Sequence, residues 1–179
     1  MRRINVRYRC SVCGLEIRMT LAPDEDPPPP KHCLEEMLVV APLSTLKFTW
    51  GREIFQTLPG VRYAVLHGSK ERRLERLADP EIDVFIINHD GIKIVEKELL
   101  ARPDINIIVV DEIASFRNAA TARWKSLQRI VAGRERVWGL TGTPTPNAPT
   151  DAWAQCRLLS PERVPKYFSQ WKDSVMKQL

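Results

Sequence analysis

The sequence has no long hydrophobic run and few cysteines, and both absences narrow the class of protein. No apolar stretch reaches the roughly eighteen residues that a transmembrane helix needs, and the arginine-rich start is not followed by the apolar segment of a secretory signal. Four cysteines in 179 residues are too few for a disulfide scaffold. We therefore expect a non-secreted, intracellular protein without membrane contact, located in the cytoplasm or on the nucleoid.

A phosphate-binding loop is also missing from the sequence. The pattern G-x-x-x-x-G-K-[ST] cradles the phosphates of a nucleotide and places a lysine on them. None of the eight glycines of this chain is followed by lysine. The chain therefore lacks the usual device by which a phosphate-loop enzyme holds ATP.

The charge balance is only modestly basic. The net charge is +5, from 27 Lys and Arg against 22 Asp and Glu. Residues 1–37 contain six of each sign, so the whole excess lies in residues 38–179. Such a balance suits contact with a phosphate backbone, but many proteins without that role share it, so it carries little weight.

An acidic pair follows the most hydrophobic short run of the chain. Ile107 to Val110 is too short for a helix and rich in β-branched residues, which predicts a buried parallel strand. Asp111 and Glu112 then emerge at the carboxyl end of that strand, where open α/β sheets bind ligands. In phosphoryl transfer one such acid holds magnesium, and its neighbour orients or deprotonates the attacking water. The alternative is an acidic pair that only caps the next helix.

A second predicted strand, Arg136 to Leu140, ends in Thr141, Gly142 and Thr143. The two hydroxyls can hydrogen-bond a phosphate-bound water or the acidic pair, and the glycine permits a close backbone approach. By itself this segment also fits an ordinary turn. Two adjacent parallel strands would deliver the acids and the hydroxyls to the same edge of one sheet.

Together these segments resemble superfamily 2 helicases, in particular the chromatin-remodeller-like (switch/sucrose-non-fermenting) branch. The resemblance covers roughly residues 38–160 and keeps the family's order. The stretches that carry it are Val39 to Ser44 (similar to motif Ia), Ile86 to Gly91, Asp111 and Glu112 with Ser115 to Asn118 (motif II), Leu140 to Asn147 (motif III) and Asp151 to Trp153.

The resemblance implies the first RecA-like lobe of a DNA-dependent ATPase or DNA translocase, with ATP and magnesium as cofactors and duplex DNA as partner. It assigns magnesium to Asp111 and activation of water to Glu112. It assigns the remaining roles as follows: coupling of nucleotide state to DNA binding by Thr141, Gly142 and Thr143; nucleic-acid contact by Pro42, Ser44, Asn88 and Asn147; and support of the acids by Arg117 and Asn118.

The chain departs from the family in two respects. The family places its phosphate loop just before motif Ia, where this chain has Cys33 to Met37, and the second lobe with its arginines is absent. Charge neutralisation by such groups accounts for several orders of magnitude in rate. We therefore expect the isolated chain to be a poor ATPase or none, and a separate polypeptide could supply the missing parts. A truncated or fused reading frame without activity of its own is the alternative.

Residues 1–37 differ from the rest and contain a zinc-knuckle pattern. Cys10 and Cys13 form Cys-x-x-Cys followed by glycine, and His32 and Cys33 are the nearby candidates for the other two ligands. A second Cys-x-x-Cys is missing, which leaves an arm with incidental cysteines as the alternative. The second functional hypothesis is therefore a non-catalytic, zinc-containing module that binds nucleic acid or protein.

The pattern after residue 37 alternates between strands and helices, which predicts an α/β fold: a RecA-like parallel sheet with helices on both faces, plus the small zinc-knuckle-like arm. We divide the chain into residues 1–37, residues 38–160 (motifs Ia to III) and a tail, 161–179. Strands are predicted at 38–41, 63–66, 83–87, from 107 and at 136–140, and helices at 44–58, 70–78, 92–100, 118–131 and 150–158.

Several residues carry local predictions. Ser44 is expected to cap the helix that follows it, and His89 to be a structural hydrogen-bonding group rather than a catalyst. The charge run Lys70 to Arg76 is expected to be a solvated helix face with internal ion pairs. The aromatic residues of the tail lack an obvious cover, which suggests an unfilled contact surface.

Overall fold

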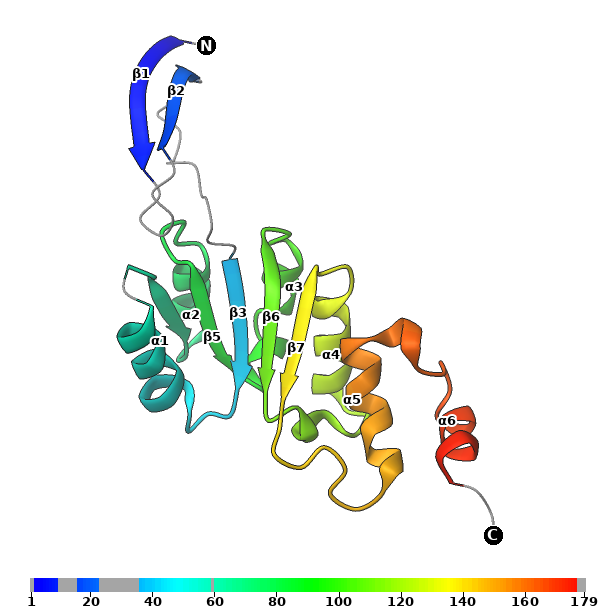
Figure 1. Ribbon diagram of the computed structural model, residues 1–179. Coiled ribbons are helices and arrows are strands. Elements are labelled where there is room, and N and C mark those ends of the chain that lie inside the picture. Colours follow the sequence, from blue (N-terminus) through cyan, green and yellow to red (C-terminus); the bar gives the residue numbers. More distant parts are fainter. Residues whose placement is uncertain (1, 10–15, 23–35, 59, 177–179) are drawn as a thin grey trace. The chain divides into compact units, whose positions relative to one another are not determined.

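The computed structural model describes residues 2–9, 16–22, 36–58 and 60–176, and the chain divides into two compact units, 1–35 and 36–179 (Figure 1). The first unit contains two antiparallel strands, β1 (Arg2–Arg9) and β2 (Glu16–Ala22). The second unit contains the sheet and all the helices of the described residues.

A five-stranded parallel sheet organises the second unit, as predicted. Its strand order is β4-β5-β3-β6-β7, so the two strands that carry the acidic pair and the threonines are neighbours. The strands are β3 (Glu36–Ala41), β4 (Tyr63–Leu66), β5 (Val84–Asn88), β6 (Ile105–Asp111) and β7 (Arg136–Leu140).

Helices cover both faces of this sheet. The α-helices are α1 (Arg52–Thr57), α2 (Lys70–Leu77), α3 (Glu96–Leu100), α4 (Ala122–Val131), α5 (Ala152–Leu159) and α6 (Phe168–Val175). The shorter turns are η1 (Leu46–Gly51), a π-helix, and the 3-10 helices η2 (Gly91–Lys93), η3 (Ile113–Phe116), η4 (Pro149–Asp151) and η5 (Pro161–Arg163). None of the described helices has the combination of length and hydrophobicity that crossing a bilayer requires.

The hydrophobic runs form strands because both faces of the sheet are buried, so no polar alternation is needed. Leu38, Val40 and Ile108 point to one face, where side chains of α2, α3, α4 and α5 cover them. Val39 and Val109 point to the opposite face, which η1 and α1 cover (Figure 1).

The helix predicted at residues 44–58 begins later than predicted and with a different type of turn. It begins at Leu46 as a π-helix, and Ser44 is exposed and does not cap it. Thr45 precedes the helix instead, and its hydroxyl donates to the Pro42 carbonyl oxygen at 3.1 Å. The chain therefore makes a tight turn between β3 and η1 before the helix begins.

Two other helices are shorter than predicted. The segment predicted at 92–100 is split into η2 and α3, and the helix predicted at 118–131 begins only at Ala122. Its cap is Thr121, whose hydroxyl accepts a hydrogen bond from the Trp124 amide at 3.3 Å.

The prediction of a solvated helix face with internal ion pairs on α2 was wrong for Arg73. This side chain is only 5% exposed, and it donates from Nε to the Gly68 carbonyl at 3.0 Å and from Nη1 to the Leu66 carbonyl at 2.6 Å. No ion pair joins two side chains of the described helix α2; Lys70 pairs instead with Glu98 of α3 at 3.7 Å. The run therefore anchors the helix to the end of β4.

Part of the tail is covered. The Trp153 indole donates to the Pro165 carbonyl at 2.9 Å and contacts the Phe168 ring edge to face at 5.6 Å. Tyr167 and Met176 nevertheless stay about half exposed. The aromatic residues of the tail thus pack against α5 on one side and leave apolar surface on the other.

Candidate functional site at the carboxyl edge of the sheet

The acidic pair and the first threonine meet at the carboxyl edge of the sheet. Asp111 pairs in register with Leu140, so Glu112 and Thr141 are the next residues of the two neighbouring strands. The Thr141 hydroxyl donates to Glu112 Oε1 at 2.6 Å. The predicted juxtaposition of acids and hydroxyls is therefore present as a direct hydrogen bond.

Glu112 has a left-handed backbone, with φ 51° and ψ 53°, and is the one non-glycine residue with positive φ in the described ranges. For an L-residue this conformation costs about 1–2 kcal/mol. The turn is held by the Ser115 amide, which donates to the Glu112 carbonyl at 2.9 Å, and by the buried side chains of Ile113 and Phe116. The packing of η3 thus imposes the strained conformation that turns Glu112 away from the strand.

Asp111 is held at two points. The Trp50 indole donates from Nε1 to Asp111 Oδ2 at 2.9 Å. His89 Nε2 lies 2.8 Å from the Asp111 carbonyl oxygen, and because a carbonyl only accepts, Nε2 carries the hydrogen. Burial lowers the pKa of His89, although the hydrogen bond to Asp111 opposes that shift. The prediction of a structural role for His89 is confirmed, with Phe116 packed against its ring at 5.0 Å.

The acidic pair fits magnesium only together with a phosphate ligand. Within the described residues, no cluster of three or more His, Cys, Asp or Glu side chains could hold a metal ion. Magnesium is commonly held by one or two carboxylates, with phosphate oxygens and water completing the shell. Asp111 Oδ1 accepts no hydrogen bond from another described residue, so this oxygen is available to a cation that arrives with a nucleotide.

The predicted zinc ligands Cys10, Cys13, His32 and Cys33 lie outside the described residues.

The predicted nucleic-acid contacts are distributed over three loops at strand ends. Ser44 is exposed beside Leu43, which is 59% exposed, in the turn after β3. Asn88 ends β5, and its side-chain oxygen accepts a hydrogen bond from Arg73 Nη1 at 3.3 Å. Asn147 is exposed, and its backbone amide donates to Asp151 Oδ2 at 3.0 Å. Ser44 and Asn147 are therefore exposed, whereas the side chain of Asn88 is partly buried.

The predicted supporting residues Arg117 and Asn118 follow η3 directly. Asn118 Oδ1 accepts from the Ala120 amide at 2.9 Å and stabilises the turn into α4. Both residues line a cavity of about 380 Å³ with Trp153 and Phe168 among its walls. No hydrogen bond joins either side chain to the acidic pair in the described part of the chain.

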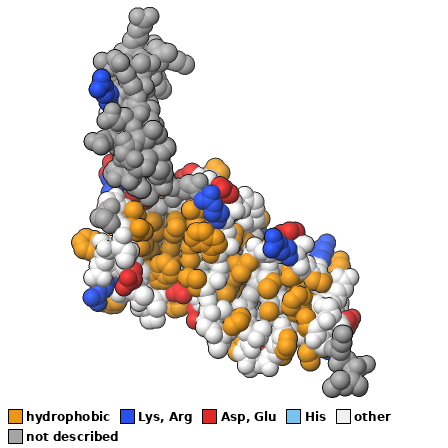
Figure 2. All heavy atoms as spheres, viewed as in Figure 1, with side chains coloured by type: hydrophobic (Ala, Val, Ile, Leu, Met, Phe, Trp, Pro, Cys, Tyr) orange, Lys and Arg blue, Asp and Glu red, His pale blue; other side chains and the backbone are white. Residues whose placement is uncertain are grey.

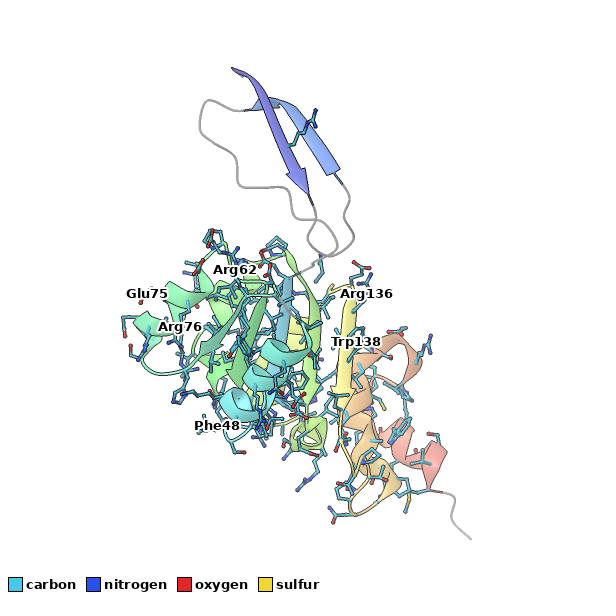
Figure 3. The ribbon with its side chains drawn as sticks, turned by 60° about the vertical axis from the view of Figure 1, so that its left-hand side comes forward. Phe48, Arg62, Glu75, Arg76, Arg136 and Trp138 are labelled. Carbon is cyan, nitrogen blue, oxygen red and sulfur yellow. The ribbon has the colours of Figure 1, made fainter. Side chains whose placement is uncertain are left out.

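A groove beside the turn after β3 was not predicted. It has a volume of about 810 Å³, and its lining combines basic and aromatic side chains, including Lys47, Phe48, Tyr63, Arg72 and Arg76. Phe48 comes from η1 and Arg76 from α2 (Figure 3). This groove could not be predicted from the sequence, because its lining comes from η1, β4 and α2, which are separate segments of the chain.

β7 is the last strand of the sheet, and its outer edge pairs with no other strand of the described residues. Val137 and Gly139 face the helices, whereas Trp138 and Leu140 point to the opposite face and are 51% and 45% exposed (Figure 3). Figure 2 shows hydrophobic side chains gathered over the central strands of that face. An edge strand with unpaired backbone groups and exposed apolar side chains can accept a further strand.

Comparisons with known proteins agree with this geometry. The family model of the SNF2-related domain matches residues 17–178. The ISWI chromatin-remodeling complex ATPase ISW2 of Saccharomyces cerevisiae is 31% identical over 140 residues, which cover 75% of this chain and 12% of that protein. The ATP-dependent DNA helicase DDM1 of Arabidopsis thaliana is 26% identical over 145 residues, 76% of this chain and 19% of that protein. The chain thus spans less than a fifth of either relative.

The fold has a match of the same type. The Sulfolobus solfataricus SWI2/SNF2 ATPase core, solved in complex with double-stranded DNA, superimposes with a TM-score of 0.60 at 27% identity, covering 78% of this chain and 28% of that one. This match confirms the predicted RecA-like sheet. The family model covers most of the sequence, and the neighbouring motifs meet at one edge of the sheet, as the two adjacent strands predicted. The chain therefore belongs to the SNF2-related domain family, in the SWI/SNF-type branch of superfamily 2.

Proposed function

We propose that residues 38–160 form part of the ATP-binding lobe of a DNA-dependent ATPase that translocates on duplex DNA. The observation that carries the proposal is the hydrogen bond from Thr141 to Glu112, because it joins the two motifs that such an enzyme must couple. The family membership supports the same function. The relatives are much longer than this chain, so hydrolysis is proposed for a complete assembly.

In that assembly the two acids have separate roles. Asp111 Oδ1 would hold magnesium, which neutralises charge on the nucleotide phosphates when it is bound. Thr141 engages Oε1 of Glu112 and leaves Oε2 to accept a proton from the attacking water. The strained backbone of Glu112 fits this role, since such strain is maintained where the surrounding structure fixes a functional side chain.

The nucleic acid would contact the turns at the strand ends. Pro42 and Ser44 lie in the exposed turn after β3, where a hydroxyl and backbone amides are available to a phosphate. Asn88 ends β5, and Asn147 lies in the loop that follows β7. Movement of Thr141, Gly142 and Thr143 on nucleotide binding would alter this edge, and Arg117 and Asn118 would support the turn after the acids.

The missing phosphate loop would come from a separate polypeptide that also carries the second lobe. A phosphate loop follows the carboxyl end of a strand and opens a helix. A strand added in parallel to the open edge of β7 would place its loop beside Thr141, at the end of the sheet that carries Glu112. Its helix could then cover the exposed Trp138 and Leu140.

Calorimetric titration of the purified chain with magnesium-ATP, with and without duplex DNA, tests the proposal. Binding in the micromolar range that Asp111→Asn abolishes would support a nucleotide site at this edge. Absence of binding under both conditions, together with no gain when complementing polypeptides are added, would overturn it. Thr150→Ala, on η4 and outside the acidic edge, serves as the matched control and should bind like the wild type.

A zinc-containing nucleic-acid- or protein-binding module is the second candidate. The observation that favours it is the pairing of Arg9 with Glu16, since β1 and β2 then flank the six-residue segment that contains Cys10 and Cys13. Two cysteines between paired strands suit a zinc knuckle, with His32 and Cys33 as the remaining ligands. One zinc ion per chain by elemental analysis, with no measurable ATP binding, would favour this function over the first.

A further inference from the structure

Trp50 has a polar contact that its sequence position does not suggest. Its indole N–H reaches Asp111 Oδ2 across 61 residues at 2.9 Å. Indole nitrogen is a donor only, so the bond fixes which carboxylate oxygen faces Trp50 and which remains for other ligands. Asp111 is the residue to which the proposed function assigns magnesium.

The π-helix η1 directs Trp50 toward this carboxylate. The Trp50 amide donates to the Thr45 carbonyl at 3.0 Å, a bond that spans five residues instead of the four of an α-helix. Leu46 and Ile54, both buried, share the inward side of the segment with Trp50. The indole is therefore held between the sheet and the helix with its N–H at the end of β6.

The next residue of the chain tightens this placement. Gly51 is buried, and a Cβ atom at this position would lie 3.0 Å from the Tyr63 ring. The backbone of η1 can approach β4 closely only because Gly51 has no side chain. The backbone that carries Trp50 is thus held close to β4.

Asp111 is consequently fixed from two directions. Trp50 holds its side chain, and His89 holds its main-chain carbonyl at 2.8 Å. The opposite oxygen, Oδ1, has no partner among the described residues. Groups behind a carboxylate that orient it toward a metal ion commonly change metal affinity 10- to 100-fold when they are removed.

We infer that Trp50 is a positioning residue for Asp111: its indole N–H orients the carboxylate so that Oδ1 is presented to the divalent cation of a bound nucleotide. This inference rests on the proposed function. The inference adds to the proposed function a positioning residue from the segment after motif Ia. Trp50 acts through Asp111 and is assigned no contact with the nucleotide or the reacting atoms.

The test uses the full chain with Mn²⁺ and ATP as probe, and electron paramagnetic resonance to measure free Mn²⁺. Trp50→Phe keeps the ring and removes only the N–H, and we expect it to weaken Mn²⁺ binding about tenfold. Asp111→Asn should abolish the binding. Trp138→Phe makes the same change at an indole for which the described residues show no hydrogen bond, and it should bind like the wild type.

A second measurement needs neither metal nor a well-folded Trp50 variant. In the ¹⁵N–¹H spectrum, the indole signals of Trp124 and Trp153 should be protected from solvent exchange by their own hydrogen bonds, and a further protected signal should belong to Trp50. Asp111→Asn should shift that signal and reduce its protection, and Trp50→Phe should remove it. Trp138→Phe should remove a different, unprotected signal.

The possible results separate the two proposals. Wild-type Mn²⁺ affinity in Trp50→Phe, with binding lost in Asp111→Asn, would overturn the role of Trp50 and leave the proposed function standing. An unchanged set of indole signals in Asp111→Asn would overturn the hydrogen bond on which the role depends. Absence of Mn²⁺ binding in the wild type, both alone and with complementing polypeptides added, would overturn the proposed function and this inference with it.

Discussion

Glu112 is the residue whose geometry most limits what the edge of the sheet can do. Its left-handed backbone and its bond to Thr141 fix one carboxylate oxygen and leave the other for a water molecule. Replacing Glu112 with Gln keeps the shape and one oxygen but removes the proton acceptor.

We therefore expect Glu112→Gln to abolish turnover in a complemented complex, by at least about a hundredfold, and to spare nucleotide binding. Steady-state ATP hydrolysis and calorimetric ATP binding, measured on the same preparation, check this expectation. Glu75→Gln is the matched control, because it makes the same change at an exposed glutamate of α2, away from the acidic pair. Unchanged turnover in Glu112→Gln would remove Glu112 from its assigned role.

Asp104, at the other end of β6, makes the stability of the fold depend on pH. Burial acts to raise the pKa of this carboxyl, but the hydrogen bonds from Arg102 prevail and hold its pKa at about 2, below the ordinary value of 3.8. The unfolded chain therefore takes up this proton at higher pH than the folded chain does. The resulting stabilisation is fully present above about pH 4 and is lost as the pH falls through about 2.

Urea unfolding of the wild type and of Asp104→Asn between about pH 2 and pH 6 measures this contribution. The free energy of unfolding of the wild type should fall more steeply with decreasing pH, because the variant has no carboxyl at this position to protonate. Asp90→Asn, at a more exposed carboxyl, is the control. Equal slopes for wild type and Asp104→Asn would show that the ion pair with Arg102 does not stabilise the fold.

At the scale of elements, two glycines near the site differ in what they permit. A Cβ at Gly139 on β7 would lie 2.7 Å from Ile113 Cδ1 and 3.0 Å from Leu159 Cδ1. At Gly142, in the following turn, a Cβ would meet nothing within 4 Å, and the backbone is not left-handed. The first glycine is therefore needed for packing β7 against η3 and α5, and the second is not needed for packing at all.

We expect Gly139→Ala to lower the free energy of unfolding by about 1–3 kcal/mol, because the core must shift to admit a methyl group. Gly142→Ala should change it by less than about 0.5 kcal/mol. If Gly142 serves close approach to a nucleotide, the same variant should still lose ATP binding. Chemical denaturation and calorimetry distinguish these effects, and a strongly destabilised Gly142→Ala would contradict the assignment.

The strands could be predicted from the sequence because hydrophobic runs buried on both faces have few other solutions. The parallel order of β6 and β7 then brought Glu112 and Thr141 together as expected. The π-helix could not be predicted, since no local sequence pattern distinguishes a backbone hydrogen bond between residues i and i−5 from one between residues i and i−4. The contact of Trp50 with Asp111 depends on that helix, so this polar partner could not be predicted from the sequence either.

Arg73 shows the same limit for a charged residue. Its sequence neighbours are charged, and the pattern indicates a solvated face, whereas its partners are backbone carbonyls of the preceding strand and turn. Backbone acceptors have no sequence signature, so the burial of this guanidinium becomes visible only when β4 and α2 are packed together.

At the scale of the whole molecule, the outer edge of β7 is the most informative feature once the family of the chain is known. Trp138 and Leu140 are about half exposed, and the cluster that η1 and α1 cover on that face contains side chains of β3, β5 and β6 but none of β7. An uncovered parallel edge of this kind promotes association with other chains. A partner that supplies a strand and a helix would bury this surface and complete the nucleotide site in one step.

We therefore expect the chain alone to self-associate through this edge, and Trp138→Lys to reduce the association measured by analytical ultracentrifugation. The substitution should cost about 1 kcal/mol of stability or less, because Trp138 is 51% exposed. Phe55→Lys is the matched control, since Phe55 on α1 is 76% exposed and lies away from β7. Equal association of the two variants would mean that the edge of β7 is not the contact surface. Loss of association in Trp138→Lys alone would instead identify the face that a complementing lobe must occupy.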